Sequence, residues 1–151
     1  MATLFSALNA SASALDAQRA RLEVATSNIA NADSTRGADG KPYRRRDVVL
    51  AAESSDSFAS VLGRVDAVGV QVKGVVEDQT PFRTRYEPSH PDADAEGFVS
   101  MPNVDVPEEM VNMLGAARAY QANLTAIGMI RDTMQRALDG LYAERRFPVI
   151  G

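Results

Sequence analysis

The sequence contains no cysteine and only one histidine, His90. Without cysteine the chain can form no disulfide and offers no thiolate metal ligand or redox chemistry. The usual zinc sites need several cysteine or histidine ligands and are therefore excluded. A Ser-His-Asp triad would have to use His90, yet no serine lies in a sequence that resembles a nucleophile elbow. We therefore expect no enzyme activity and no cofactor.

Long apolar runs are also missing. No stretch approaches the ~20 apolar residues that a membrane span requires, and we expect no membrane insertion. The first residues lack a basic start, and Ser6, Asn9 and Ser11 interrupt their apolar character, so no cleavable signal peptide is expected. The formal charge of −4 over 151 residues argues against a protein built to bind nucleic acid or an anionic membrane.

The strongest pattern lies in the C-terminal part, where apolar residues recur at alternating steps of four and three. This spacing is typical of a helix that holds one face against a partner. Asp105 and Glu108 have the spacing of a capping box, and Pro107 falls in the first turn. A helix of ~36 residues would be ~54 Å long, about three times the usual length. The line comprises Val106, Met110, Met113, Ala117, Tyr120, Leu124, Ile127, Arg131, Met134, Leu138 and Leu141.

A second line of the same spacing runs through residues 3–31. Alanine fills much of the remaining sequence and favours a helix that neighbours can approach closely. Asn28 and Asn31 are predicted to end this helix by competing for its backbone groups. The apolar members of the line are Leu4, Leu8, Leu15, Leu22, Ala25 and Ile29.

The middle of the chain predicts a small β-rich insert. Residues 31–42 read as a loop with a turn at Asp39-Gly40. Short strands are predicted at residues 48–50, 68–72, 82–86 and 98–101, whereas residues 53–62 fit either a loop or a helical turn. The predicted fold is mainly α with a β-rich insert (α+β), and its long terminal helices pair as an antiparallel coiled coil. Residues 1–31 and 105–143 form one discontinuous assembly domain, 32–104 the insert and 144–151 a tail.

Neither terminal helix can hide its apolar stripe alone. The insert of ~60 residues is too small to cover helices of such length, so the remaining apolar edges are predicted to face another chain. Arg131, the only charged member of its line, has two interpretations. Its guanidinium reaches solvent along the helix, or it pairs with a carboxylate on a neighbouring subunit and fixes the register, which we slightly favour.

Two polar clusters also have competing interpretations. Asp92 opens an EF-hand-like loop with Gly97 at its sixth position, but Asn103 replaces the bidentate glutamate at the twelfth. A polar turn whose carboxylates accept hydrogen bonds from backbone amides is the favoured interpretation. The three arginines at 44–46 could contact phosphate, but a solvated strand start or an ion-paired edge is favoured in an acidic chain.

Two segments carry a family resemblance. SNIANADSTRGADGKPYRRRDVVL at 27–50 resembles the signature of bacterial flagellar rod, hook and hook-associated proteins. YEPSHPDADAEGFVSMPNVDVPEEMVNMLGAARAYQANLTAI at 86–127 is similar to the proximal rod members of that family. The motif residues are Asn28, Asn31, Pro88, His90, Pro91, Asp92, Asp94, Gly97, Pro102 and Asn103.

The resemblance implies a structural subunit of the basal-body rod, the periplasmic drive shaft of the flagellum. Such subunits leave the cell through the flagellar type III export apparatus and polymerise through their terminal helices. Partners would be other rod proteins, further copies, the inner (MS) ring and the rod-seeding subunit. The resemblance also implies that Asn28 and Asn31 satisfy backbone groups at the helix end and that residues 88–103 contact neighbours. Alternatives are another rod component or a non-flagellar type III secreted coiled-coil protein.

If the terminal helices are completed by neighbours, the free subunit should be less helical than these stretches imply. Circular dichroism of the purified monomer is expected to show far fewer than ~65 helical residues, because packing supplies most helix stability. A fully helical monomer would contradict this prediction.

Overall fold

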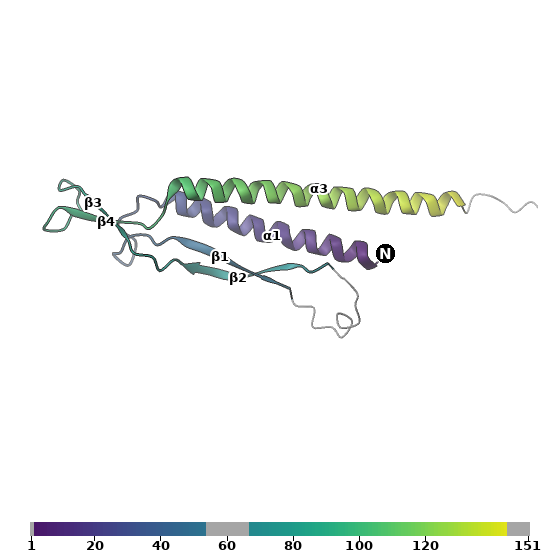
Figure 1. Ribbon diagram of the computed structural model, residues 1–151, viewed down its shortest axis with the longest axis horizontal. Coiled ribbons are helices and arrows are strands. Elements are labelled where there is room, and N and C mark those ends of the chain that lie inside the picture. Colours follow the sequence, from purple (N-terminus) through teal and green to yellow (C-terminus); the bar gives the residue numbers. More distant parts are fainter. Residues whose placement is uncertain (1, 54–66, 145–151) are drawn as a thin grey trace, which may run out of the picture.

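The computed structural model describes residues 2–53 and 67–144 and shows an elongated molecule (Figure 1). Two long helices carry most of its length, and two small antiparallel sheets accompany them. The order is α1 (Ala2–Ala30), β1 (Arg46–Ala52), β2 (Val70–Glu77), β3 (Arg83–Tyr86), β4 (Phe98–Met101) and α3 (Val106–Glu144). The predicted α+β class and the presence of the four predicted strands are thus confirmed. Strand β1 is longer than the predicted 48–50, and β2 runs from Val70 to Glu77 rather than from 68 to 72. The ambiguous segment 53–62 lies almost wholly outside the described residues, as does the tail beyond Glu144.

Helix α1 is the middle layer of the molecule. It runs antiparallel to α3 on one side and contacts both strands of the β1–β2 sheet on the other, while α3 packs against no other described element (Figure 1). Its most buried positions are small, with Ala17 and Ala25 at 1% and 4% exposure. Alanine removes little apolar area, but it lets two layers approach the same helix closely. Neither described helix is both long and apolar enough to cross a membrane.

The face of α3 that meets α1 lies one residue away from part of the predicted line. Met113, Tyr120, Ile127 and Met134 are half-buried as members of that line, whereas the alternate members Met110, Ala117, Leu124 and Arg131 are exposed. Glu109 and Ala116, at 2% and 1% exposure, take the most buried places. The observed contact face includes a buried charged residue, Glu109. Hydrophobic spacing alone does not predict that a glutamate faces the partner helix.

The C-terminal part of α3 extends past the first turn of α1. Helix α3 has 39 residues and α1 has 29, and Figure 1 shows the end of α3 projecting beyond the start of α1. Leu138 and Leu141 continue the line there but are 41% and 57% exposed, because no residue of α1 lies opposite them. The start of α3 is capped as predicted, since the Glu108 amide donates to Asp105 Oδ1 at 3.4 Å.

The β1–β2 sheet is anchored to α1 by hydrogen bonds from its backbone to α1 side chains, and it carries a bulge. The Val70 amide donates to Ser13 Oγ of α1 at 3.0 Å. The register shifts between Val49 and Leu50, which is the signature of a β-bulge and re-aims the strand. Strand β2 leaves valines exposed, among them the consecutive Val75 and Val76 at 50% each, which point to opposite faces of the sheet.

The β3–β4 sheet lies at the end of the molecule where α1 ends and α3 begins (Figure 1). Val99 and Met101 are the buried residues of β4, and Val104, shortly after the strand, is also fully buried. On the other face, the rings of Tyr86 and Phe98 meet edge to face with centroids 5.3 Å apart. Gly97 adopts φ +85°, and a Cβ there would stand 2.9 Å from the Tyr86 ring and 3.0 Å from Pro88.

Gly97→Ala is therefore expected to destabilise the protein by about 1–2 kcal/mol, because the left-handed backbone and the close ring both disfavour a side chain. Urea unfolding followed by tyrosine fluorescence measures the change. Gly115→Ala is the matched control, since a Cβ there meets nothing within 4 Å. It should stabilise helix α3 by about 0.5–1 kcal/mol. Equal effects of the two substitutions would contradict this account.

Candidate functional site

Asn28 is the buried centre where the end of α1 meets the start of β1. Its side chain forms two hydrogen bonds with the backbone of Arg46, as a neighbouring strand would. The Nδ2 donates to the Arg46 carbonyl at 2.8 Å, and the Oδ1 accepts from the Arg46 amide at 3.0 Å. The other two positions of this amide are also filled. Nδ2 donates to Glu109 Oε2 at 3.0 Å, and the Tyr43 hydroxyl donates to Oδ1 at 3.0 Å. An asparagine has two donors and two acceptor positions, so Asn28 is fully satisfied at 1% exposure.

Glu109, in the first turn of α3, is the only charged residue that the described chain buries almost completely. Its Oε1 accepts from Arg45 Nε at 2.7 Å, and its Oε2 accepts from Asn28. The Arg45 guanidinium also lies 3.5 Å from Asp78 and 3.7 Å from Asp47. A buried carboxylate is tolerable only when both oxygens are paired in this way.

Asn103 ties the segment before α3 to the same place. Its Oδ1 accepts from the Arg45 amide at 2.8 Å, and its Nδ2 donates to Thr80 Oγ1 at 2.8 Å. The Asp78 amide donates to the Arg45 carbonyl at 2.8 Å. Connections from α1, α3 and the segments beside β1 and β2 thus meet at one set of residues, which we call the polar hub. The polar hub consists of Asn28, Tyr43, Arg45, Asp78, Asn103 and Glu109.

The surroundings of the polar hub raise the pKa of Arg45 and lower the pKa of Asp78. Burial alone would lower the pKa of Arg45, but the hydrogen bond and charge of Glu109 outweigh it and raise that pKa. Hydrogen bonds from the Thr80 amide and hydroxyl, and then the charge of Arg45, lower the pKa of Asp78. Asp78 therefore stabilises the fold above its ordinary pKa, and this contribution is lost as the pH falls through the lowered value.

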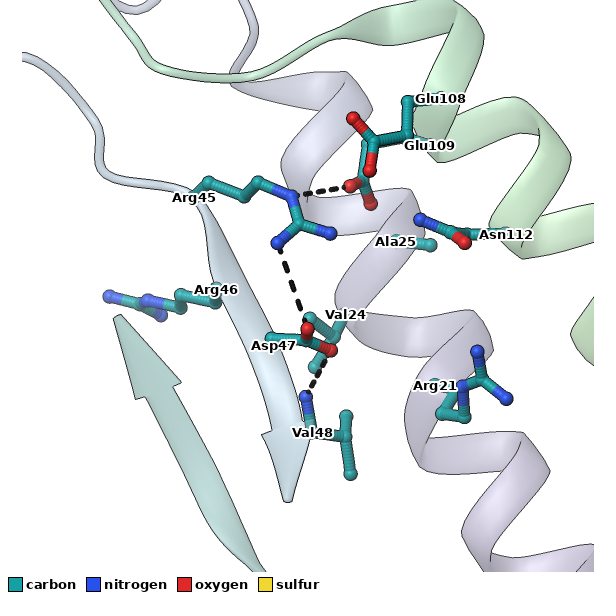
Figure 2. Close-up of a pocket in the computed structure, with 10 residues that line it drawn as sticks. All are labelled: Arg21, Val24, Ala25, Arg45, Arg46, Asp47, Val48, Glu108, Glu109 and Asn112. Carbon is teal, nitrogen blue, oxygen red and sulfur yellow. Dashed lines mark hydrogen bonds and ion pairs between the residues drawn. The ribbon is translucent and has the colours of Figure 1, made fainter. Parts of the chain in front are cut away.

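The open cleft beside the polar hub has no catalytic arrangement. Figure 2 shows that Arg21, Asp47 and Asn112 line it together with Arg45 and Glu109. Both oxygens of Glu109 are occupied, so the carboxylate is not available as a general base. Among the described residues no group of acidic or histidine side chains is placed to hold a metal. The arrangement fastens elements together.

The acidic segment before β4 adopts the favoured polar turn. Asp94 Oδ1 accepts from the amides of Glu96 and Phe98 at 2.9 and 2.8 Å, and His90 Nδ1 accepts from the Asp92 amide at 3.1 Å. Asp92 itself accepts from the Thr35 hydroxyl at 2.8 Å and lies 3.4 Å from Arg36. These carboxylates are committed to the chain and hold its loops in place.

The remaining motif residues divide between the hub and the loops. Asn31 Nδ2 donates to the Ser27 carbonyl at 2.9 Å, so it satisfies the end of α1 as expected. Asn28 satisfies the β1 backbone instead. Pro102 is fully buried, Pro88 lies against Gly97, and Pro91 borders a groove beside Phe98.

Sequence reasoning missed the role of four hub residues, Tyr43, Arg45, Asp78 and Glu109. Glu109 looked like one of two acidic residues that favour a helix start, and only its neighbour Glu108 remains exposed. The three-arginine run was expected to be a solvated strand start or an ion-paired edge. Arg46, the first residue of β1, fits this, since its side chain is half exposed and lies 4.0 Å from Glu77. Arg44 instead donates to the Asp78 carbonyl at 2.8 Å and stacks on Phe82.

Comparison with known proteins explains this architecture. A family model described as "Flagella basal body rod protein" matches residues 6–38, and one described as "Flagellar basal body rod FlgEFG protein C-terminal" matches residues 95–140. The FlgC rod protein of Salmonella typhimurium is 47% identical over 83% of this chain and 89% of its own length. The Bacillus subtilis FlgC is 43% identical over 91% of this chain and 97% of its own. The chain belongs to the FlgC family of flagellar basal-body rod proteins.

A more distant FlgC, from Borreliella burgdorferi, is still 37% identical over 89% of this chain and 95% of its own length. The FlgC-family chain is a structural subunit of the flagellar basal-body rod and not an enzyme. The family places it in the flagellar basal body, among other rod components with which it assembles. The polar hub joins the two matched regions. Asn28 belongs to the first and Asn103 and Glu109 to the second, while the other hub residues lie between them in the sequence.

Glu109→Gln is expected to destabilise this FlgC-family protein by roughly 2–3 kcal/mol, because the amide cannot accept from Arg45 and Asn28 together and leaves the guanidinium without its partner. Urea unfolding measures the loss. Glu108→Gln removes the same charge from an exposed neighbour and should change stability by less than about 0.5 kcal/mol. If the two variants unfold alike, the buried ion pair does not hold the helices together.

Proposed function

We propose that this rod subunit polymerises through its two terminal helices and that the resulting wall is the periplasmic drive shaft that transmits torque. The observation that carries the proposal is the incomplete cover of α3. One face of α3 meets α1, and no other described element packs on the rest of its length. A helix of 39 residues draws its stability from packing, so a neighbour is expected to supply the missing contacts.

The uncovered side of α3 carries large apolar side chains beside the α1 contact. We call Met110, Leu114, Ala117 and Leu124 the flank stripe. Met110, Leu114 and Leu124 are 54%, 51% and 48% exposed. The stripe follows helical spacing, and Ala117 would let another helix approach closely. These features support helix-on-helix packing between subunits, in which α1 and α3 take part as a coiled coil.

Arg131 continues this side of α3 toward its C-terminal end. It is exposed, and its guanidinium forms no ion pair with any described residue of its own chain. We retain the interpretation that it meets a carboxylate on a neighbouring subunit and so helps to fix the axial register. The remaining residues of the two predicted lines, from Leu4 to Ile29 and from Val106 to Leu141, are proposed to support this packing in two ways. Half-buried members such as Tyr120 hold α3 against α1 within the subunit, and exposed members such as Leu138 and Leu141 are proposed to contact a neighbour.

Torque transmission would rest on the polar hub as well as on the helices. A shaft must not bend where its subunits change from helix to insert, and the hub fastens that junction with the 2.7 Å Arg45–Glu109 pair. By family likeness we infer export through the flagellar type III apparatus without a cleaved signal peptide. The inferred neighbours are other proximal rod proteins, the inner ring and the rod-seeding subunit.

Leu124→Glu should abolish rod assembly and motility while leaving export intact, because it places an unpaired carboxylate in the proposed contact. Motility in soft agar and the protein in purified basal bodies report assembly, and the protein in culture medium reports export. Leu124→Met keeps an apolar side chain and should stay motile. Thr133→Glu places the same charge on the opposite, exposed side of α3 and should be milder. Normal basal bodies in the Leu124→Glu strain would refute the flank stripe as an interface.

A further inference from the structure

The middle of the α1–α3 contact buries a polar atom of Gln18 that has no hydrogen-bond partner. On one side of α1, Asn28 bonds to Glu109, and on the other side the Thr26 hydroxyl lies 3.9 Å from the Met113 sulfur. The sector of α1 between these two contacts therefore faces α3, and Gln18 lies in this sector two to three turns nearer the N-terminus. Its side chain is half-buried. Among the described residues, its Oε1 is the one buried side-chain polar atom without a hydrogen-bond partner.

Helix α3 offers no donor to this oxygen. The two helices are antiparallel and rise equally per residue, so Gln18 lies level with residues 119–121 of α3 (Figure 1). Tyr120 is half-buried there, and Asn123 on the next turn donates its Nδ2 to the Ala119 carbonyl of its own helix at 2.9 Å. Within the part of the chain that the structure describes, neither side chain bonds to Gln18. The α1–α3 contact is thus fully bonded at the polar hub and incompletely bonded in its middle.

Gln18 therefore makes the free subunit less stable than an apolar side chain of the same shape would. A carbonyl oxygen that leaves water without gaining a donor costs free energy, and an apolar group in its place removes that cost. Methionine is unbranched, has about the length of glutamine and adapts to irregular space, so it fits the same position. Polar residues between paired helices are best known for selecting partner and register at a cost in stability. The position of Gln18 is thus typical of a residue that serves the assembled state.

We propose that Gln18 selects the neighbour in the rod, and that its amide oxygen accepts a hydrogen bond from a polar side chain on a helix of an adjacent rod subunit. This deepens the proposed function and rests on it. The next residue, Arg19, keeps 72% of its side chain exposed, so the edge of the contact beside Gln18 is open to a helix packed along α1. Part of Gln18 is itself exposed, and a change of rotamer brings its amide to that edge. A neighbour that supplies a donor is thereby favoured over one that brings only apolar groups.

Gln18→Met removes the amide and keeps the shape of the side chain. The unfolding temperature of the purified full-length subunit, followed by circular dichroism, should rise by about 2–4 °C because the unpartnered oxygen is gone. The amount of the variant in purified basal bodies should nevertheless fall about fivefold, the loss expected for one hydrogen bond, while its export into the medium stays unchanged. Ser11→Ala is the matched control. It removes a hydroxyl from the same side of α1, one heptad away, and should leave incorporation unchanged.

The neighbour itself is identified by crosslinking. A photo-crosslinking amino acid in place of Arg19 lies beside Gln18 at the open edge of the contact. After irradiation of cells and purification of basal bodies, mass spectrometry should find it joined to a helix of a rod subunit, either this chain or a related one. The same amino acid in place of Lys73, on the exposed strand β2, is the control and should not capture that helix.

Three results would overturn the proposal. A higher unfolding temperature of Gln18→Met with normal incorporation would show that the amide has no part in the rod. An unchanged or lower unfolding temperature would show that the oxygen already has a partner in the free subunit. Capture of a ring protein, or of no helix, from position 19 would exclude the proposed neighbour. Assembly through the flank stripe would still stand in each case, because Leu124→Glu tests it separately.

Discussion

The fold depends on one buried ion pair. Glu109 in the first turn of α3 pairs with Arg45, which precedes β1, and accepts a hydrogen bond from Asn28 near the end of α1. A carboxylate at 2% exposure would unfold its surroundings if it stood alone, so the three segments can be in place only together. This requirement joins two helices that are separated by more than seventy residues of chain.

The same buried ion pair explains how the two long helices are kept in a fixed relative position at one end of the subunit. The hub lies at one end of the α1–α3 pair, and from there the helices rely on shallow contacts between small and medium side chains such as Ala17 and Ala25. Ion pairs and hydrogen bonds need defined distances and angles. Contacts between small apolar side chains do not fix the position of one helix along the other in this way. The subunit is thus held firmly at the hub and remains open to completion by neighbours along its helices.

Helix α3 is only partly covered because of the order in which the helices and the β1–β2 sheet are layered. Helix α1 is enclosed between α3 and the β1–β2 sheet, so α3 and the outer face of the sheet are left at the surface. An exposed apolar side chain such as Leu124 would be a liability in an isolated protein. In a FlgC-family rod subunit we propose that it meets a neighbouring chain.

Periodicity determined the two helices, since a spacing of four and three has few other solutions, and alternation with turn residues determined the strands. The rotation of α3 came only with the tertiary structure, because Glu109 faces inward through a partner that lies 64 residues away in Arg45. Asn28 likewise binds the backbone of β1 rather than that of its own helix end, and this too depends on a partner that only the tertiary structure brings close. Local sequence specifies which backbone each segment prefers. Which polar groups may be buried is decided by partners that only the folded chain brings within hydrogen-bonding distance.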